Sequence, residues 1–316
     1  MKLLVLIALA AALAAGATAW KASRHERLAE AEWPPSGDFL TIDGQRVHYV
    51  VDGEGPDLVL IHGASGNLRD FTFDMVGRLK DRYRVIAFDR PGLGYTDRID
   101  ANGASIAQQA DLLARAASEL GAHRPIVFGH SYGGSVALAW AVNRPDALSA
   151  LVLSAAASNT WDTGLGTYYS VLSHPLGQKL VIPLITAWVP DRVVSQQIDA
   201  VFLPQAPPQG YDARIGAGLT LRRVSMRANA LHRAGLLDEI RAQVPRYGEI
   251  AVPVEILHGD ADTTVPLHVH SEPLSRQIPN AALTVLPGVG HMPHHAAPEA
   301  TDAAIDRAAR RATPAP

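Results

Sequence analysis

The stretch that decides the fold reads Pro125-Ile126-Val127-Phe128-Gly129-His130-Ser131-Tyr132-Gly133. Its apolar first half predicts a buried strand, and its second half places a serine between two glycines with the spacing G-x-S-x-G. Glycines two positions before and after a serine permit a sharp, strained turn that exposes the hydroxyl, and residues 132–140 favour the helix that must follow. The stretch therefore predicts a strand, a nucleophile elbow at Ser131 and a helix.

A nucleophilic serine needs a base to take its proton and a carboxylate to orient that base. The strand-like run 254–258 breaks into a loop with Asp260 and Asp262, and a second run, 282–286, ends shortly before His291. In a parallel sheet the carboxyl ends of the strands lie along one edge. We therefore expect Ser131, one of the two aspartates and His291 to meet there.

These motifs resemble, in type and order, the α/β-hydrolase fold family, in particular its single-lid esterases, cofactor-free haloperoxidases and carbon–carbon bond hydrolases. Residues 61–67 resemble the oxyanion loop, and residues 87–96 resemble the Asp-x-Pro-Gly-x-Gly-x-Ser turn, with Thr96 where serine is usual. The resemblance runs from about Phe39 to the last helix. It implies an α/β fold with a mostly parallel eight-stranded sheet, helices on both faces and a helical cap insertion.

The resemblance also implies roles for single residues. Asp262 is expected to be the acid of a Ser131-His291-Asp262 triad, with Asp260 a turn residue. The backbone amides of Ala64 and Tyr132 are the expected oxyanion hole, because fixed amide donors suit a negative charge that develops on a carbonyl oxygen.

The chain order predicts a hydrolase core in two segments, 38–156 and 249–316. Between them, residues 157–248 carry helical patterns broken by prolines, and an insertion of this length in a compact domain is usually functional. We interpret it as the cap. Its large apolar residues are either substrate-pocket residues or packing within the cap: Trp161, Tyr168, Tyr169, Trp188, Phe202 and Met226. The basic residues Arg222, Arg223 and Arg227 are interpreted as a solvated helix face, with an acid-binding site as the alternative.

The amino terminus contains an uncharged stretch, residues 3–19, between Lys2 and Lys21. As a helix it would span ~26 Å, close to the ~30 Å hydrocarbon layer of a bilayer. Two interpretations stay open: a signal peptide cleaved after Ala17-Thr18-Ala19, or an uncleaved membrane anchor. The basic residues that come directly after the apolar stretch slightly favour the anchor. The protein is then anchored in a membrane or exported, and residues 20–37 are expected to form a linker.

Composition excludes several classes of function. The chain has 316 residues, of which 47% are hydrophobic, and a net charge of -3, which gives no footprint for nucleic acid. It has no cysteine, so disulfides and thiol catalysis are excluded. No Gly-rich phosphate loop follows the first strand, so no cofactor is expected. His291, His294 and His295, with His268 and His270, lack the spaced cysteines or carboxylates of a closed zinc site, so no metal is expected either.

The sequence thus predicts a serine hydrolase that acts on an ester-type bond of a small, largely apolar molecule. A haloperoxidase or perhydrolase, a lactonase and a carbon–carbon bond hydrolase stay open, because they can use the same triad. A small-molecule receptor on this fold is the alternative from another class. A serine at the elbow argues against dehalogenase chemistry, which needs a carboxylate nucleophile. The sequence predicts no oligomeric state.

Overall fold

The computed structural model describes residues 1–312, so the last four residues of the predicted core segment 249–316 lie outside the described part. A single eight-stranded sheet has the order β1-β2-β4-β3-β5-β6-β7-β8. The strands β1 and β2 form an antiparallel hairpin, β2 pairs antiparallel with β4, and all other neighbours are parallel. The predicted fold class is confirmed. The strands are β1 (Asp38–Ile42), β2 (Gln45–Asp52), β3 (Asp57–Ile61), β4 (Arg84–Phe88), β5 (Ile126–His130), β6 (Ala150–Ser154), β7 (Val254–Gly259) and β8 (Ala281–Leu286).

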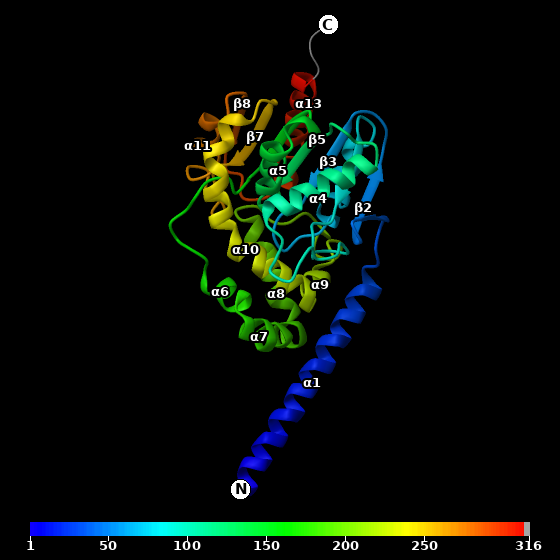
Figure 1. Ribbon diagram of the computed structural model, residues 1–316, viewed down its shortest axis with the longest axis vertical. Coiled ribbons are helices and arrows are strands. Elements are labelled where there is room, and N and C mark those ends of the chain that lie inside the picture. Colours follow the sequence, from blue (N-terminus) through cyan, green and yellow to red (C-terminus); the bar gives the residue numbers. More distant parts are fainter. Residues whose placement is uncertain (313–316) are drawn as a thin grey trace.

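Helices cover both faces of this sheet and one end of it (Figure 1). Before β6 they are α1 (Lys2–Glu32), α2 (Arg69–Thr72), α3 (Met75–Leu79), α4 (Ile106–Glu119) and α5 (Tyr132–Asn143). Between β6 and β7 they are α6 (Thr167–Ser173), α7 (Pro175–Trp188), α8 (Asp191–Phe202), α9 (Ala217–Thr220) and α10 (Arg223–Gln243). After β7 they are α11 (Ser271–Gln277), α12 (Pro293–Ala296) and α13 (Pro298–Ala312).

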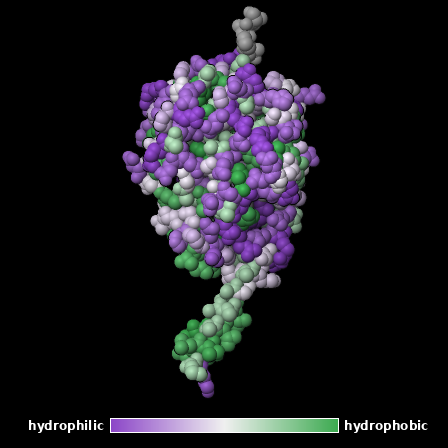
Figure 2. Space-filling view, viewed as in Figure 1, coloured by the Kyte–Doolittle hydropathy of each residue, from purple (hydrophilic) through white to green (hydrophobic). Residues whose placement is uncertain are grey.

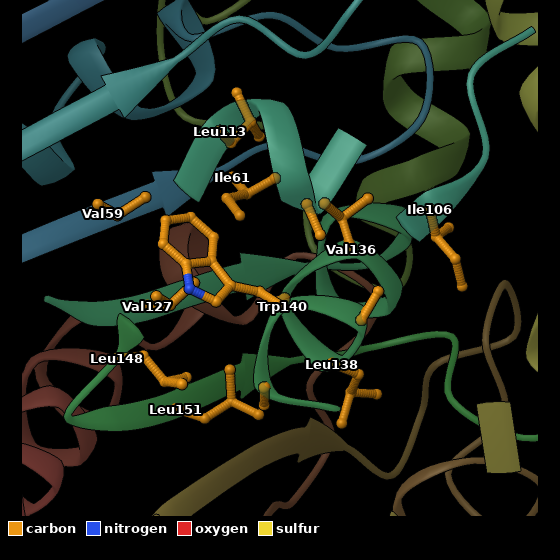
Figure 3. Close-up of a cluster of buried hydrophobic side chains, with 14 of the residues drawn as sticks. Val59, Ile61, Ile106, Leu113, Val127, Val136, Leu138, Trp140, Leu148 and Leu151 are labelled. Atoms are coloured by element: carbon orange, nitrogen blue, oxygen red, sulfur yellow. The ribbon is translucent and has the colours of Figure 1, made fainter. Parts of the chain in front are cut away.

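The central strands are apolar on both faces because helices pack on each side. Side chains alternate along a strand, so Leu58 and Leu60 of β3 belong to the cluster with α2, α3 and α13, whereas Val59 and Ile61 belong to the cluster with α4 and α5. Figure 3 shows the second cluster, in which the fully buried Trp140 of α5 lies among side chains of β3, β5 and β6. This packing fixes α5, the helix that begins just after Ser131.

Local signals mark both ends of α4. Ser105 and Gln108 form a capping box, in which the Ser105 hydroxyl accepts from the Gln108 backbone N–H and the Gln108 side chain accepts from the Ser105 backbone N–H. Gly121, just after the helix, has φ +81°, the left-handed conformation that favours glycine at a helix end.

The helices of the predicted cap segment, residues 157–248, gather at the end of the sheet where the parallel strands finish (Figure 1). In α10, the Asn229 side chain accepts from the Ser65 backbone N–H and donates to the Ser65 hydroxyl in the loop after β3, at 2.8 and 2.9 Å. Further along α10, Leu236 and Ile240 are buried in the core cluster around Trp140. The segment is thus tied to the core, and its last helix is partly a core helix.

The prediction that residues 20–37 form a linker is wrong for most of this range, because α1 continues to Glu32. The body of the protein stabilises this second half of the helix. Ala22 and Ala29 are buried, the guanidinium of Arg223 binds the Glu26 carboxylate at 2.6 Å, and that of Arg222 binds Glu30 at 2.9 Å. A helix that looks solvated in the sequence is docked by partners almost two hundred positions away.

The same contacts correct the interpretation of the basic residues in α10. Arg222 is buried, and besides Glu30 it donates to the carbonyl of Gly94. Arg223 is half-buried against α1. These two arginines therefore form a docking surface for α1 and not a solvated face.

Candidate active site

Ser131 lies in the strained turn that the sequence predicts. Its φ of 51° and ψ of -119° fall outside the ordinary regions for a residue with a side chain. The glycines around it permit close packing: a Cβ on Gly133 would overlap the carbonyl oxygen of Ile61, and one on Gly129 would lie 2.5 Å from the carbonyl oxygen of Gly133. The turn therefore requires glycine at both positions and points Ser131 away from the strand.

The structure brings the three predicted residues into one hydrogen-bonded chain. The Ser131 hydroxyl donates to Nε2 of His291 at 2.9 Å, and Nδ1 of His291 donates to Oδ2 of Asp262 at 2.7 Å. All three side chains are buried. They follow β5, β7 and β8, so the carboxyl edge of the sheet is what assembles them.

Besides His291, other groups also hold the Asp262 carboxylate in place. Its Oδ1 accepts the backbone N–H groups of Thr264 and Val265 at 2.8 and 2.9 Å, and Nε2 of His258 lies 3.2 Å from its Oδ2. Burial by itself raises the pKa of Asp262, but the hydrogen bonds from His258 and His291 outweigh it and hold that pKa well below its usual value. Asp262 is therefore an ionised, fixed acceptor for the imidazole.

Asp260, the other aspartate of this loop, lies elsewhere. Its carboxylate accepts the backbone N–H of Gly288 at 2.6 Å and has an exposed position. This contact joins the turn after β7 to the turn after β8, as a turn residue does.

The loop after β3 packs directly on the elbow. A Cβ on Gly63 would lie 3.0 Å from Nδ1 of His130 and 3.3 Å from Cβ of Ser131, which is tighter than ordinary van der Waals contact. The buried Arg90 fixes the loop, since its guanidinium donates to the carbonyls of His62 and Gly63 at 2.9 and 3.0 Å. Nε2 of His62 accepts the backbone N–H of Arg90 at 3.0 Å. Burial and the Arg90 charge lower the pKa of His62 to about 4, so the ring is neutral at neutral pH.

The two amides expected to form an oxyanion hole lie on either side of this contact. Ala64 follows Gly63 in the loop, and Tyr132 is the first residue of α5. Among residues 1–312, no protein group accepts a hydrogen bond from the backbone N–H of Ala64 or of Tyr132. Both donors are therefore available to a ligand beside Ser131.

His130 has a function that the sequence did not indicate. Its Nε2 donates to the backbone carbonyl of His291 at 2.9 Å, and its ring lies 5.1 Å from the ring of His291. Burial and the neighbouring His294 and His291 hold the pKa of His130 well below its usual value, so the ring is neutral. The residue before the serine thus fixes the backbone of the base, a long-range contact with no local sequence signal.

A second buried polar cluster adjoins His130. Asp70 of α2 accepts from Nε2 of His294 at 3.1 Å, from Nε2 of His295 at 2.8 Å and from the Tyr211 hydroxyl at 2.7 Å. The ligand atoms of the aspartate and the two histidines lie within 4.8 Å of one another, so these residues could together hold a divalent cation. The sequence pattern gave no carboxylate near the two histidines, because Asp70 is far from them in the chain. As it stands, three donors satisfy the carboxylate.

The predicted pocket residues form two groups: one group packs in or against buried clusters, and the other is exposed. Phe202 is buried against Met292, the neighbour of His291, and Met226 is buried in α10 among Leu172 and Ile182. The ring of Trp161 lies 6.0 Å from that of His270, beside the core cluster.

The other predicted pocket residues, Tyr168 and Trp188, are more than half exposed. Tyr168 packs edge to face with Tyr169, and the Trp188 indole donates to the Thr18 hydroxyl of α1 at 3.2 Å. The structure therefore directs Trp188 towards α1 and leaves Tyr168 on the surface.

A family model described as the alpha/beta hydrolase fold matches residues 56–298. With the sheet order and the elbow, this match shows that the chain belongs to the α/β-hydrolase fold family, and it is a hydrolase. A relative named haloalkane dehalogenase 2 from Mycobacterium tuberculosis is 26% identical over 278 residues, which cover 82% of this chain and 90% of the relative.

Two solved structures have the same fold. A thermophilic esterase from Thermogutta terrifontis is 21% identical with a TM-score of 0.68, and the match covers 87% of this chain and 99% of that one. A protein described as a membrane phospholipase A, a bacterial virulence factor, is 22% identical with a TM-score of 0.66, covering 98% of this chain and 97% of that one. The second match is long enough to include most of α1.

Proposed function

We propose that this protein is a serine hydrolase that cleaves an ester-type bond in a small, largely apolar molecule. The observation that carries the proposal is the chain of hydrogen bonds from Ser131 through His291 to Asp262. The strained backbone of Ser131 and the available amides of Ala64 and Tyr132 support it. Phe202 and Met292, the chain neighbour of His291, belong to one buried apolar cluster, which supports an apolar substrate.

The mechanism follows from the geometry. Oγ of Ser131 bonds to the ester carbonyl carbon while Nε2 of His291 takes its proton, and the negative oxygen forms against the amides of Ala64 and Tyr132. The imidazolium returns that proton to the leaving alcohol as the ester C–O bond breaks. Water then attacks the acyl-enzyme with the same base and frees the acid. Throughout, Asp262 keeps Nδ1 of His291 protonated and stabilises its positive charge.

Hydrolysis of p-nitrophenyl esters of increasing acyl length tests the proposal. We expect turnover with an optimum chain length, and a fall in kcat of roughly 10⁴-fold to 10⁶-fold in Ser131→Ala. Ser154→Ala is the matched control, because Ser154 is also buried next to the elbow and its hydroxyl has no partner among residues 1–312. Turnover that survives Ser131→Ala contradicts the mechanism. Intact protein without turnover of any ester contradicts the proposed substrate class.

We also propose that α1 is retained as a membrane anchor. The helix is long and apolar enough to cross a membrane, features that a signal sequence shares. Its second half, after Ala19, is docked on the body by Glu26 and Glu30, which favours retention of one continuous helix. The intact mass of the protein purified from membranes tests this. A mature chain that begins at Trp20 contradicts the anchor.

A further inference from the structure

The helix α7 presents an apolar face to the outside of the protein. Leu176, Leu180, Leu184 and Trp188 are each at least half exposed, and their spacing of four residues places them along one side of the helix. The opposite side of α7 packs inward through Ile182 and Thr186. Exposed apolar side chains in a continuous row mark an interaction surface. We call these four residues the α7 face.

The α7 face lies next to the projecting helix α1. The two helices are in contact, and Trp188 interacts there with both Thr18 and Lys21: the indole donates to the Thr18 hydroxyl, and the ammonium of Lys21 lies 3.8 Å from the centre of the indole ring. On the amino-terminal side of this point, residues 2–17 of α1 are exposed and project from the body (Figure 1). Figure 2 shows apolar surface on the projecting helix and on the adjacent end of the body, with a paler stretch where the helix joins the body.

The contact between Trp188 and α1 indicates where along α1 the surface of a membrane lies. The projecting segment, residues 2–17, is ~24 Å long as a helix, so an anchor made from it has the bilayer surface near Thr18. Tryptophan and lysine are typical of that interfacial level, and Trp188 and Lys21 meet there. The α7 face begins at Trp188 and therefore lies at the same level, on the side of the body that faces the lipid.

We propose that the α7 face is a second membrane contact, which lies in the boundary between headgroups and acyl chains beside the anchor. The occupant is the lipid bilayer, because the face lies next to the apolar helix α1. Lys179, exposed between Leu176 and Leu180, has a side chain long enough to reach the headgroups. The inference rests on the anchor proposed above. It places residues 157–248, and hence the end of the sheet that carries Ser131, against the membrane.

The absence of cysteine makes a direct test simple. Leu180→Cys in the full-length chain receives an environment-sensitive NBD label, and the protein is reconstituted into phosphatidylcholine vesicles. Arg310→Cys is the matched control, since Arg310 is exposed on α13, at the opposite end of the body (Figure 1). We expect blue-shifted emission at position 180 that lipids with brominated acyl chains quench, and water-like, unquenched emission at position 310. Ester hydrolysis by both labelled proteins checks the fold.

Each other outcome is decisive. A chain that floats with the vesicles but keeps a water-like label at position 180 overturns this inference and leaves the anchor intact. Blue-shifted emission that bromolipids do not quench, and that depends on protein concentration in detergent, assigns the face to a second copy of the chain and also overturns it. A chain that does not float contradicts the anchor and the inference together. None of these results alters the serine dependence of hydrolysis, so the proposed reaction is judged separately.

Discussion

The guanidinium of Arg90 clamps the backbone of Gly63: its Nη2 donates to the Gly63 carbonyl at 3.0 Å, while its Nε donates to the preceding carbonyl at 2.9 Å. Arg90 is completely buried, binds the Gln109 side-chain oxygen at 2.7 Å and lies 4.3 Å from the ring centre of Tyr132. Burial lowers the pKa of Arg90 to about 10, so the group still carries its charge at neutral pH. One side chain thus connects the loop that carries Ala64 to the helix that begins at Tyr132.

We expect replacement of Arg90 to lower kcat, because it loosens the loop that carries Ala64, while the hydrogen bonds among Ser131, His291 and Asp262 stay in place. Lysine cannot bind two carbonyls and stack on an aromatic ring together, so Arg90→Lys should lower kcat on p-nitrophenyl esters by about tenfold or more. Arg98→Lys is the control, because within residues 1–312 the half-buried Arg98 side chain donates only to the carbonyl of Ala101. Steady-state kinetics on both variants provide the measurement. Wild-type kcat in Arg90→Lys would show that the loop does not depend on this clamp.

The two aspartates of the loop after β7 should respond very differently to the same change. Asp262→Asn removes the acceptor that keeps Nδ1 of His291 protonated, and kcat should fall by roughly 10⁴-fold. Asp260→Asn alters only the turn contact with Gly288, and kcat should change by less than about twofold. Parallel kcat measurements at pH 8 compare the two. Equal losses in both variants would reject Asp262 as the specific partner of His291.

Stability should fall as the pH drops from 7 to 5. Burial lowers the pKa of His62, His270 and His294 to about 4, whereas an unfolded histidine titrates near 6.5. Between pH 6.5 and 4 the unfolded chain therefore binds more protons, and the free energy of unfolding rises with pH in that window. The full effect is up to about 2 kcal/mol for each histidine between pH 7 and 5.

Urea denaturation at pH 7 and pH 5 measures this dependence. Nδ1 of His270 accepts the backbone N–H groups of Ser158 and Asn159, so it must stay unprotonated in the folded state. His270→Gln removes one titrating group and should flatten the pH dependence. An unfolding free energy that is constant from pH 7 to 5 would contradict the prediction. Asp70, Asp89 and Asp262 do not affect it, because hydrogen bonds from their partners hold the pKa values of these carboxyls below their usual values. Burial raises the pKa values of Glu239 and Asp302, and these two groups act in the opposite direction.

The elbow should not tolerate an added methyl group at Gly133. A Cβ there would overlap the Ile61 carbonyl oxygen and lie 2.6 Å from the His62 carbonyl oxygen. Gly133→Ala is therefore expected to cost roughly 3 kcal/mol of stability and to lower kcat, because α5 must move away from β3. Gly77→Ala is the control: this exposed helical glycine has no atom within 4 Å of an added Cβ, and alanine should stabilise α3 by up to about 1 kcal/mol. Thermal melts of both variants decide the matter, and a Gly133→Ala chain as stable as the wild type would refute the steric argument.

By itself, the sequence predicted alternating strands and helices, a nucleophile elbow at Ser131 and a base at His291, and it narrowed the acid to Asp260 or Asp262. Each of these positions is encoded locally, because an apolar strand precedes a turn of characteristic composition. The choice of Asp262 and the eight-stranded fold came from the family resemblance. Because parallel strands end at one edge of the sheet, these residues were expected to meet there. For the same reason the capping box of α4 was predictable, because the partners are three residues apart.

Only the tertiary structure decided the contacts between distant segments. Three contacts join residues that have no fixed spacing in the sequence. Arg90 donates to the carbonyl of Gly63, His130 donates to the carbonyl of His291, and Asp70 accepts from His294 and His295. The error over residues 20–37 has the same cause. The charged second half of α1, after Ala19, looks solvated until Arg222 and Arg223 are known to face it. Whether such a charge meets water or an arginine depends on how distant elements pack.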